Sequence, residues 1–194
     1  MGAKSEQKKQ HILKTAKKVF IQKGYRTVSM KDIVEACEIS RGGLYLYYNN
    51  TAEIFRDLLK MEASQTDENL EEDLAEGTSA SEILMVFFKA QKSEILAKGG
   101  SLIMAIYEYC FENKDGNFEN TLKSQFDVGA KIIESLIQTG IENGEFQCVY
   151  PELEAKNMMY AIEGMKIMAQ TTEISAKELD SEMAYLISRI AIEE

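Results

Sequence analysis

The stretch from residue 28 to residue 55 constrains the fold of this 194-residue chain more than any other. It reads VSMKDIVEACEISRGGLYLYYNNTAEIF, and a serine precedes each of two short runs in which apolar residues recur at helical spacing. Ser29 and Ser40 can each cap the free backbone N–H groups of a helix start, and Asp32 stands at the third position after Ser29. The stretch therefore predicts two short helices joined by a tight turn, with a third helix directly after them.

The second of these helices has two different faces. Leu44 and Tyr48 lie four residues apart and form an edge that can be buried. The other face carries an arginine, two glycines, two tyrosines and a leucine, namely Arg41, Gly42, Gly43, Tyr45, Leu46 and Tyr47. Small residues allow close approach to a duplex, arginine can hydrogen-bond guanine, and tyrosine hydroxyls can reach phosphate. This face is suited to the major groove of DNA.

Residues 33–48, IVEACEISRGGLYLYY, resemble the helix-turn-helix signature of the TetR/AcrR family of bacterial transcriptional regulators. The direct matches are Ile39, Ser40, Gly42, Leu44 and Tyr45. Tyr48 stands at a phenylalanine position, Glu38 at a turn glycine, Tyr47 at a histidine and Thr51 at a phosphate-binding lysine. Since two of these changes alter groups expected to touch DNA, the operator sequence cannot be transferred from relatives.

From the residues and the resemblance together we expect nine positions to contact double-stranded DNA: Ser29, Lys31, Arg41, Gly42, Gly43, Tyr45, Leu46, Tyr47 and Thr51. The major groove is expected to receive Arg41, Gly43, Tyr45, Leu46 and Tyr47. Phosphate contacts are expected from Lys31, Tyr45 and Thr51. The resemblance favours a repressor over an activator.

The charge distribution supports this interpretation although the chain as a whole is acidic, with a net charge of −10. Residues 1–50 hold ten lysines and arginines against four acids, a net charge of +6. The remaining residues hold 12 basic and 28 acidic groups, a net charge of −16. A basic head on an acidic body confines the field that attracts DNA to one end of the chain.

Helical patterns continue to the C-terminus, and no strand pattern or repeat occurs. The sequence predicts an all-α fold of about nine helices, with a DNA-binding domain at residues 1–50 and an effector-binding and dimerisation domain at residues 51–194. Helices are expected at about 5–23, 50–74, 101–112 and 118–142, and others begin after Ser79, at Pro151 and after Ser175. Because residues 101–112 are apolar nearly all round, we expect them in the middle of a bundle.

The last two predicted helices have broad apolar faces. In the family that the chain resembles, this pair forms a four-helix bundle with its copy in a second subunit. The resemblance therefore implies a homodimer that presents two heads to half-sites about 34–36 Å apart on a palindromic operator.

The resemblance also implies a small-molecule effector, which we expect to be apolar, in the body. Candidate contacts are Phe88, Met104, Tyr107, Glu108, Phe111, Phe126, Met158, Ile162 and Met165. Core packing is the commoner role for each of the apolar residues, and both roles stay open here. Glu108 or Glu163 could pair with a cationic ligand, and Cys110 is the best candidate in the body for a redox-sensing thiol.

Enzymatic function is not indicated. His11 is the sole histidine, and neither G-x-S-x-G nor H-E-x-x-H is present. Cys37, Cys110 and Cys148 are widely spaced, which favours reduced thiols in a cytoplasmic protein over disulfides or zinc. We expect no catalytic residue, no metal, no cofactor and no membrane segment. The alternative to a regulator is a helical protein-interaction or ligand-carrier module without DNA binding.

Overall fold

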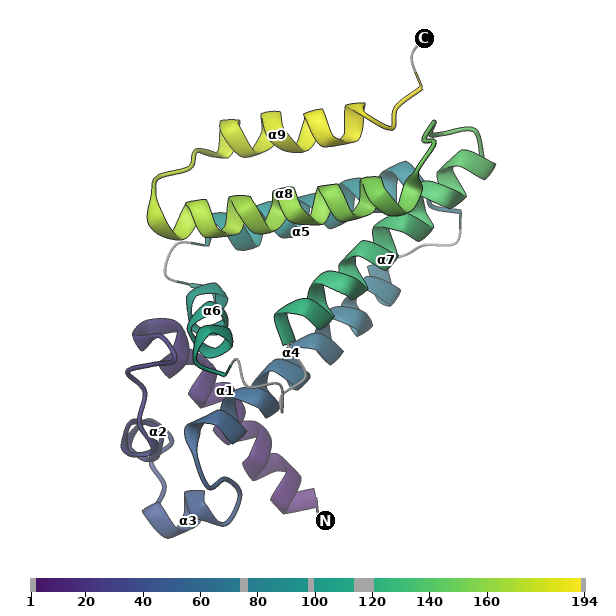
Figure 1. Cartoon of the computed structure of the whole chain (residues 1–194). Coiled ribbons are helices and arrows are strands. Elements are labelled where there is room, and N and C mark those ends of the chain that lie inside the picture. Colours follow the sequence, from purple (N-terminus) through teal and green to yellow (C-terminus); the bar gives the residue numbers. More distant parts are fainter. Residues whose placement is uncertain (1–2, 74–76, 98–99, 114–120, 193–194) are drawn as a thin grey trace. The chain divides into compact units, whose positions relative to one another are not determined.

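A computed structural model describes residues 3–73, 77–97, 100–113 and 121–192 (Figure 1). Over these residues the chain forms nine helices, and an isolated β-bridge pairs Phe146 with Ala191. The all-α prediction is confirmed. The helices are α1 (Ala3–Lys23), α2 (Met30–Ala36), α3 (Arg41–Tyr45), α4 (Thr51–Asp73), α5 (Ala80–Leu96), α6 (Ile103–Glu112), α7 (Thr121–Glu142), α8 (Pro151–Thr171) and α9 (Ala176–Ser188).

The described helices divide into two compact units, each with its own hydrophobic core. The first unit holds α1, α2, α3, α4 and α6, and the second holds α5, α7, α8 and α9. The helices α4 and α6 thus belong to the same compact unit as α2 and α3, which form the helix-turn-helix segment. The functional division at residue 50 is a separate matter and stays a prediction.

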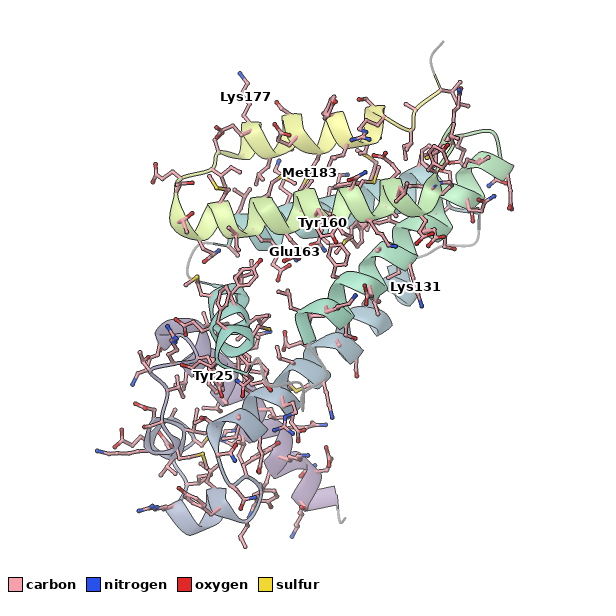
Figure 2. The ribbon with its side chains drawn as sticks, in the orientation of Figure 1. Tyr25, Lys131, Tyr160, Glu163, Lys177 and Met183 are labelled. Carbon is pink, nitrogen blue, oxygen red and sulfur yellow. The ribbon has the colours of Figure 1, made fainter. Side chains whose placement is uncertain are left out.

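The core of the first unit centres on four aromatic rings. Phe55 at the start of α4 lies 4.8 Å from Phe20 of α1, 5.1 Å from Tyr25 and 5.1 Å from Tyr109 of α6, measured between ring centroids. Figure 2 labels Tyr25, which follows the end of α1. Edge-on and tilted ring contacts of this kind add to the free energy gained by burying apolar area. The cluster joins α1, α4 and α6 in one core, and α2 packs against α1 in the same unit.

The α6 helix does not lie in the middle of a bundle as its sequence predicted. Met104 is 44 % exposed and Phe111 is 62 % exposed, whereas Leu102, Ala105 and Tyr109 enter the core of the first unit. A run of apolar residues shows that burial is favourable but does not determine how many faces receive a partner. The prediction was therefore wrong about the surroundings of α6, though right about its existence.

Helix starts in the second unit follow the predicted chemistry. Ser79 forms a capping box with Glu82, Ser175 forms one with Glu178, and Pro151 occupies the first turn of α8. One long-range cap could not be seen in the sequence. The Glu145 carboxylate accepts hydrogen bonds from the backbone N–H groups of Ala80 (3.3 Å) and Ser81 (2.9 Å), and these bonds lower the pKa of Glu145.

In the second unit, α5 contacts both α8 and α9 (Figure 1). Figure 2 shows Met183 between α9 and α8, while Lys177 points away from them. Among the residues that the structure describes, no helix is long and apolar enough to span a bilayer.

Candidate DNA-binding surface

The start of α2 is held by a capping box. The backbone N–H of Ser29 donates to Asp32 Oδ2 (2.8 Å), and the backbone N–H of Asp32 donates to Ser29 Oγ (3.3 Å). Lys23 at the end of α1 pairs with the same carboxylate, and these contacts hold the pKa of Asp32 well below its usual range. Because Ser29 Oγ also donates its proton to Asp32 Oδ2, the predicted DNA contact at Ser29 has its hydroxyl engaged within the protein.

The turn between α2 and α3 is a Schellman motif with glutamate at the position where glycine is usual. Ile39 N–H donates to Val34 O (3.3 Å) and Glu38 N–H donates to Glu35 O (3.2 Å). Glu38 has φ +53°, the sole positive φ among the described non-glycine residues. The left-handed backbone at this position explains why the family that the chain resembles has a glycine there, and it places strain in the turn that aims α3.

Replacing Glu38 by glycine is expected to stabilise the first unit by about 1 kcal/mol. The left-handed conformation costs a side chain about 1–2 kcal/mol, and the greater freedom of glycine in the unfolded chain cancels part of that gain. Thermal denaturation measures the difference. Glu38→Gln is the control, because it removes the charge and keeps the strain, and an equal gain in that variant would attribute the effect to charge.

The α3 helix begins where the sequence predicted. Gly43 N–H donates to Ser40 Oγ (3.1 Å), which caps the helix start. Leu44 is 0 % exposed and Tyr48 is 3 % exposed, so the predicted buried edge is confirmed. The helix ends at Tyr45, and Leu46 is its C-cap residue. Figure 1 shows this short helix beside α2 at the end of the first unit.

On the exposed side of α3, Arg41 and Tyr45 form a cation–π pair. The Arg41 guanidinium carbon lies 5.5 Å from the centroid of the Tyr45 ring, and both side chains are exposed. No acidic group lies within 4 Å of Arg41 among the described residues. The ring limits the rotamers of the arginine and leaves its N–H donors available, which favours bidentate hydrogen bonding to a guanine.

Gly42 has no structural reason to be glycine within the described chain. Beyond the backbone of α3 and its chain neighbours, a Cβ built on Gly42 meets no described atom within 4 Å, and its φ is not positive. Glycine in a helix is less stable than alanine by about 0.5–1 kcal/mol, so a partner outside the chain is the remaining reason for a small residue here. Close approach of the helix to a DNA backbone or base edge is such a reason.

Gly42→Ala is accordingly expected to have opposite effects on stability and binding. The free energy of unfolding should rise by about 0.5 kcal/mol because helix propensity improves. Operator binding should weaken by about 1–3 kcal/mol, the usual cost of inserting a methyl group into a close-packed contact. Denaturation and fluorescence anisotropy on one preparation give both values. Unchanged DNA affinity would mean that α3 does not approach the duplex along Gly42.

The other predicted contacts differ in their surroundings. Lys31 is exposed, and its Nζ lies 3.6 Å from Glu35 Oε1. Water therefore screens most of the attraction between the two charges. Tyr47 is half-buried and packs against the core of the first unit, so only part of its ring can face DNA. Thr51 begins α4, where Asn50 Oδ1 accepts the N–H of Glu53 (2.9 Å). The Glu53 carboxylate accepts the backbone N–H of Asn49 (2.8 Å) and the side-chain amide of Asn50 (3.4 Å).

Half of the basic residues in the first 50 positions have an acidic partner within 4 Å. The pairs are Lys9–Asp57, Lys17–Glu62, Lys23–Asp32, Arg26–Glu112 and Lys31–Glu35. Within the described residues, the five without an acidic group inside 4 Å are Lys4, Lys8, Lys14, Lys18 and Arg41. The net charge counted from the sequence therefore overstates the positive field, because α4 and α6 contribute acids to the same unit.

Comparison with known proteins identifies the family. Residues 12–58 match the model of bacterial regulatory proteins of the tetR family, and residues 83–180 match the model of the tetracyclin repressor-like C-terminal domain. The uncharacterized HTH-type transcriptional regulator YfiR of Bacillus subtilis (strain 168) is 30 % identical over 149 residues, which cover 75 % of this chain and 71 % of that protein. The chain belongs to the TetR family.

A further relative is similar in sequence to this TetR-family chain, and a solved structure is similar in fold. The fatty acid metabolism regulator protein of Bacillus subtilis (strain 168) is 26 % identical over 140 residues, covering 70 % of this chain and 69 % of that protein. A crystal structure described as a transcriptional regulator from Saccharomonospora viridis in complex with choline has a TM-score of 0.85 at 18 % identity, covering 97 % and 100 % of the two chains. The protein is a DNA-binding transcriptional regulator, and its family is not one of enzymes.

The residues that the sequence suggested for the effector of this TetR-family protein fall in both units. Four lie on α6 in the first unit: Met104, Tyr107, Glu108 and Phe111. Five lie in the second unit: Phe88, Phe126, Met158, Ile162 and Met165. Within the second unit, Phe88, Met158, Ile162 and Met165 are buried, and the half-buried Phe126 lies 4.7 Å from the Tyr160 ring.

Both carboxylates considered for a cationic ligand already have partners. Glu108 Oε2 accepts the backbone N–H of Arg26 (2.9 Å), which ties α6 to the segment between α1 and α2. Glu163 on α8, labelled in Figure 2, accepts from Lys166 Nζ (3.1 Å), and the Lys166 side chain is only 15 % exposed. These pairings reduce the negative potential that either group could offer to a bound cation.

Proposed function

We propose that this TetR-family regulator acts as a homodimer that represses transcription from an inverted-repeat operator and releases it when an apolar small molecule binds the second unit. The observation that carries the proposal is the exposed side of α3, where Arg41 and Tyr45 stand beside a glycine that the chain itself does not require. The proposal extends to Ser29, Lys31, Gly43, Leu46, Tyr47 and Thr51 as DNA contacts. Repression is proposed on family grounds.

Salt dependence tests the DNA-binding part without knowledge of the operator. A dimer that neutralises several phosphates should lose about 10³-fold or more in affinity for a mixed-sequence duplex between 50 and 200 mM salt, because bound counterions are released on association. Fluorescence anisotropy gives the slope of log affinity against log salt concentration. A flat dependence, with a protein partner retained at high salt, would favour the alternative of a helical interaction module.

Dimerisation through α8 and α9 is supported by the outward face of α8. At 100° per residue, Leu153, Tyr160, Gly164 and Ile167 lie opposite the buried face of the helix, and the three large side chains are 57 %, 65 % and 44 % exposed. Outside the backbone of α8 and the chain neighbours of Gly164, a Cβ on this glycine would meet no atom of the described residues within 4 Å. A glycine between two exposed apolar side chains, Tyr160 and Ile167, permits close approach of a second helix. Tyr185 of α9 adds a further exposed ring.

Gly164→Leu is expected to weaken the dimer at least tenfold, because a bulky side chain would hold the two α8 helices apart. Sedimentation velocity on the wild-type protein should show a particle of twice the 21.9 kDa chain mass. Gln138→Leu adds a side chain of the same kind to an exposed position of α7 and should leave the dimer intact. A wild-type monomer, or a Gly164→Leu dimer of unchanged affinity, would exclude this interface.

The proposed effector site consists of Phe88, Phe126, Met158, Ile162 and Met165 in the second unit. Apolar and methionine side chains accommodate varied apolar shapes, and the paired state of Glu163 favours an uncharged ligand over a cation. A relative named for fatty acid metabolism makes acyl chains the first compounds to test, and choline is the cationic comparison.

If this effector proposal is right, ligand binding should change both the thermal stability of the protein and its affinity for the operator. Binding must favour a conformation with lower operator affinity, so an effector should both raise the melting temperature and release DNA. Phe126→Ala should weaken release by acyl compounds and leave operator binding without ligand unchanged. Release by choline but not by acyl compounds would contradict the apolar assignment.

A further inference from the structure

Leu46 is the most exposed large apolar side chain in the described part of the chain, at 83 %. It belongs to neither hydrophobic core and does not pack against either as a partly buried residue. Its backbone is nevertheless held in place, with φ −69° and ψ −20°, and its N–H donates to Gly42 O (3.2 Å). The side chain is thus fixed at its base and stabilises no described contact within the protein.

Leu46 lies on the outermost line of α3, meaning the line along the helix surface that faces directly away from the buried edge. Because successive residues turn by 100°, Leu46 points away from the buried Leu44 and Tyr48 and lies one turn beyond Gly42. Apart from the backbone of α3 and the neighbours of Gly42, no atom of the described residues lies within 4 Å of a Cβ at Gly42, so the surface next to Leu46 is backbone. Arg41 and Tyr45 form their cation–π pair on one side of this line. The outer line therefore consists of bare backbone followed by one aliphatic group.

An aliphatic side chain at this line can recognise one feature of the major groove. Leucine has no hydrogen-bond donor or acceptor, and among the four bases only thymine presents a methyl group in that groove. We propose that Leu46 determines part of the operator sequence by contacting the 5-methyl group of a thymine in each half-site. The inference rests on the proposed DNA-binding role of α3, and it adds which chemical group of the DNA the Leu46 side chain recognises.

The test replaces single thymines of the selected operator by deoxyuridine, which removes the methyl group and keeps every hydrogen bond of the base pair. Replacing the contacted thymine in one half-site should lower wild-type affinity about fourfold, the effect expected from burial of one methyl group. Replacing it in both half-sites should lower the affinity about 15-fold. Leu46→Ala should bind the thymine operator more weakly and show no further loss with deoxyuridine. Leu46→Met should keep the sensitivity.

The possible outcomes separate the inference about Leu46 from the proposal that the protein binds DNA through α3. Failure to bind any selected duplex would remove the DNA-binding proposal itself. An operator bound tightly but without loss at any deoxyuridine position would overturn the role of Leu46 and leave DNA binding intact. Sensitivity that persists in Leu46→Ala would assign the methyl contact to another residue. Since Leu46 is exposed, the variants should fold as the wild type does, and circular dichroism verifies this.

Discussion

Arg41→Ala is expected to weaken operator binding by about 1–3 kcal/mol for each half-site, or about 5–150-fold for one contact and more for the dimer. The Arg41 side chain is exposed, stacks on Tyr45, and has no acidic group within 4 Å among the residues that the structure describes. Its loss should therefore remove a DNA contact without disturbing the fold. Competition binding with operator variants measures the loss and the base position to which it belongs.

Arg41→Lys is the matched variant for this prediction. Lysine keeps the positive charge but lacks the planar fork that hydrogen-bonds both acceptors of guanine. It should retain binding to mixed-sequence DNA and its salt dependence, and it should lose most of the preference for guanine at one position. Equal loss on every sequence in both variants would assign Arg41 to phosphate and not to a base.

Phe55→Ala is expected to have the largest effect on stability, a loss of about 3–5 kcal/mol in the free energy of unfolding of the first unit. Phe55 is 0 % exposed and touches the rings of Phe20, Tyr25 and Tyr109, so the cavity would open where α1, α4 and α6 meet. Urea denaturation measures the total loss. Hydrogen exchange should show that protection falls in α1, α4 and α6 and persists in α8 and α9.

Phe111→Ala provides the control for that substitution. It makes the same chemical change on α6 at a side chain that is 62 % exposed, and it should cost less than about 1 kcal/mol. A comparable loss in both variants would contradict the description of the aromatic cluster as the centre of the first core. Loss of protection in α8 after Phe55→Ala would contradict the separation of the two cores.

Local chemistry in the sequence predicted most of the fold. Ser29, Ser40, Ser79 and Ser175 mark helix starts because a hydroxyl oxygen can accept an otherwise unpaired backbone N–H, and each does so in the structure. The exposed side of α3 was also recognised from spacing alone, since burial of Leu44 and Tyr48 determines which residues face away.

Features that depend on residues far apart in the sequence could not be predicted. The cap that Glu145 supplies to α5 and the contact of Glu108 with Arg26 join positions more than 60 residues apart. Neither has a sequence pattern. The strain at Glu38 was detectable only as a departure from a family glycine, and its positive φ gives the physical reason. The half-buried state of Tyr47 arises from packing against the first core, which helical periodicity alone does not give.

The most direct test of the central claim is selection of the purified protein on random duplex DNA followed by sequencing of the retained molecules. A dimer with two α3 helices should recover an inverted repeat whose half-sites lie about one helical turn apart, roughly 10 base pairs centre to centre or a multiple of that spacing. Each half-site should contain a guanine whose preference is lost in Arg41→Lys. Recovery of no motif at low salt, with a control regulator enriched in parallel, would contradict the assignment of α3 as the helix that reads an operator.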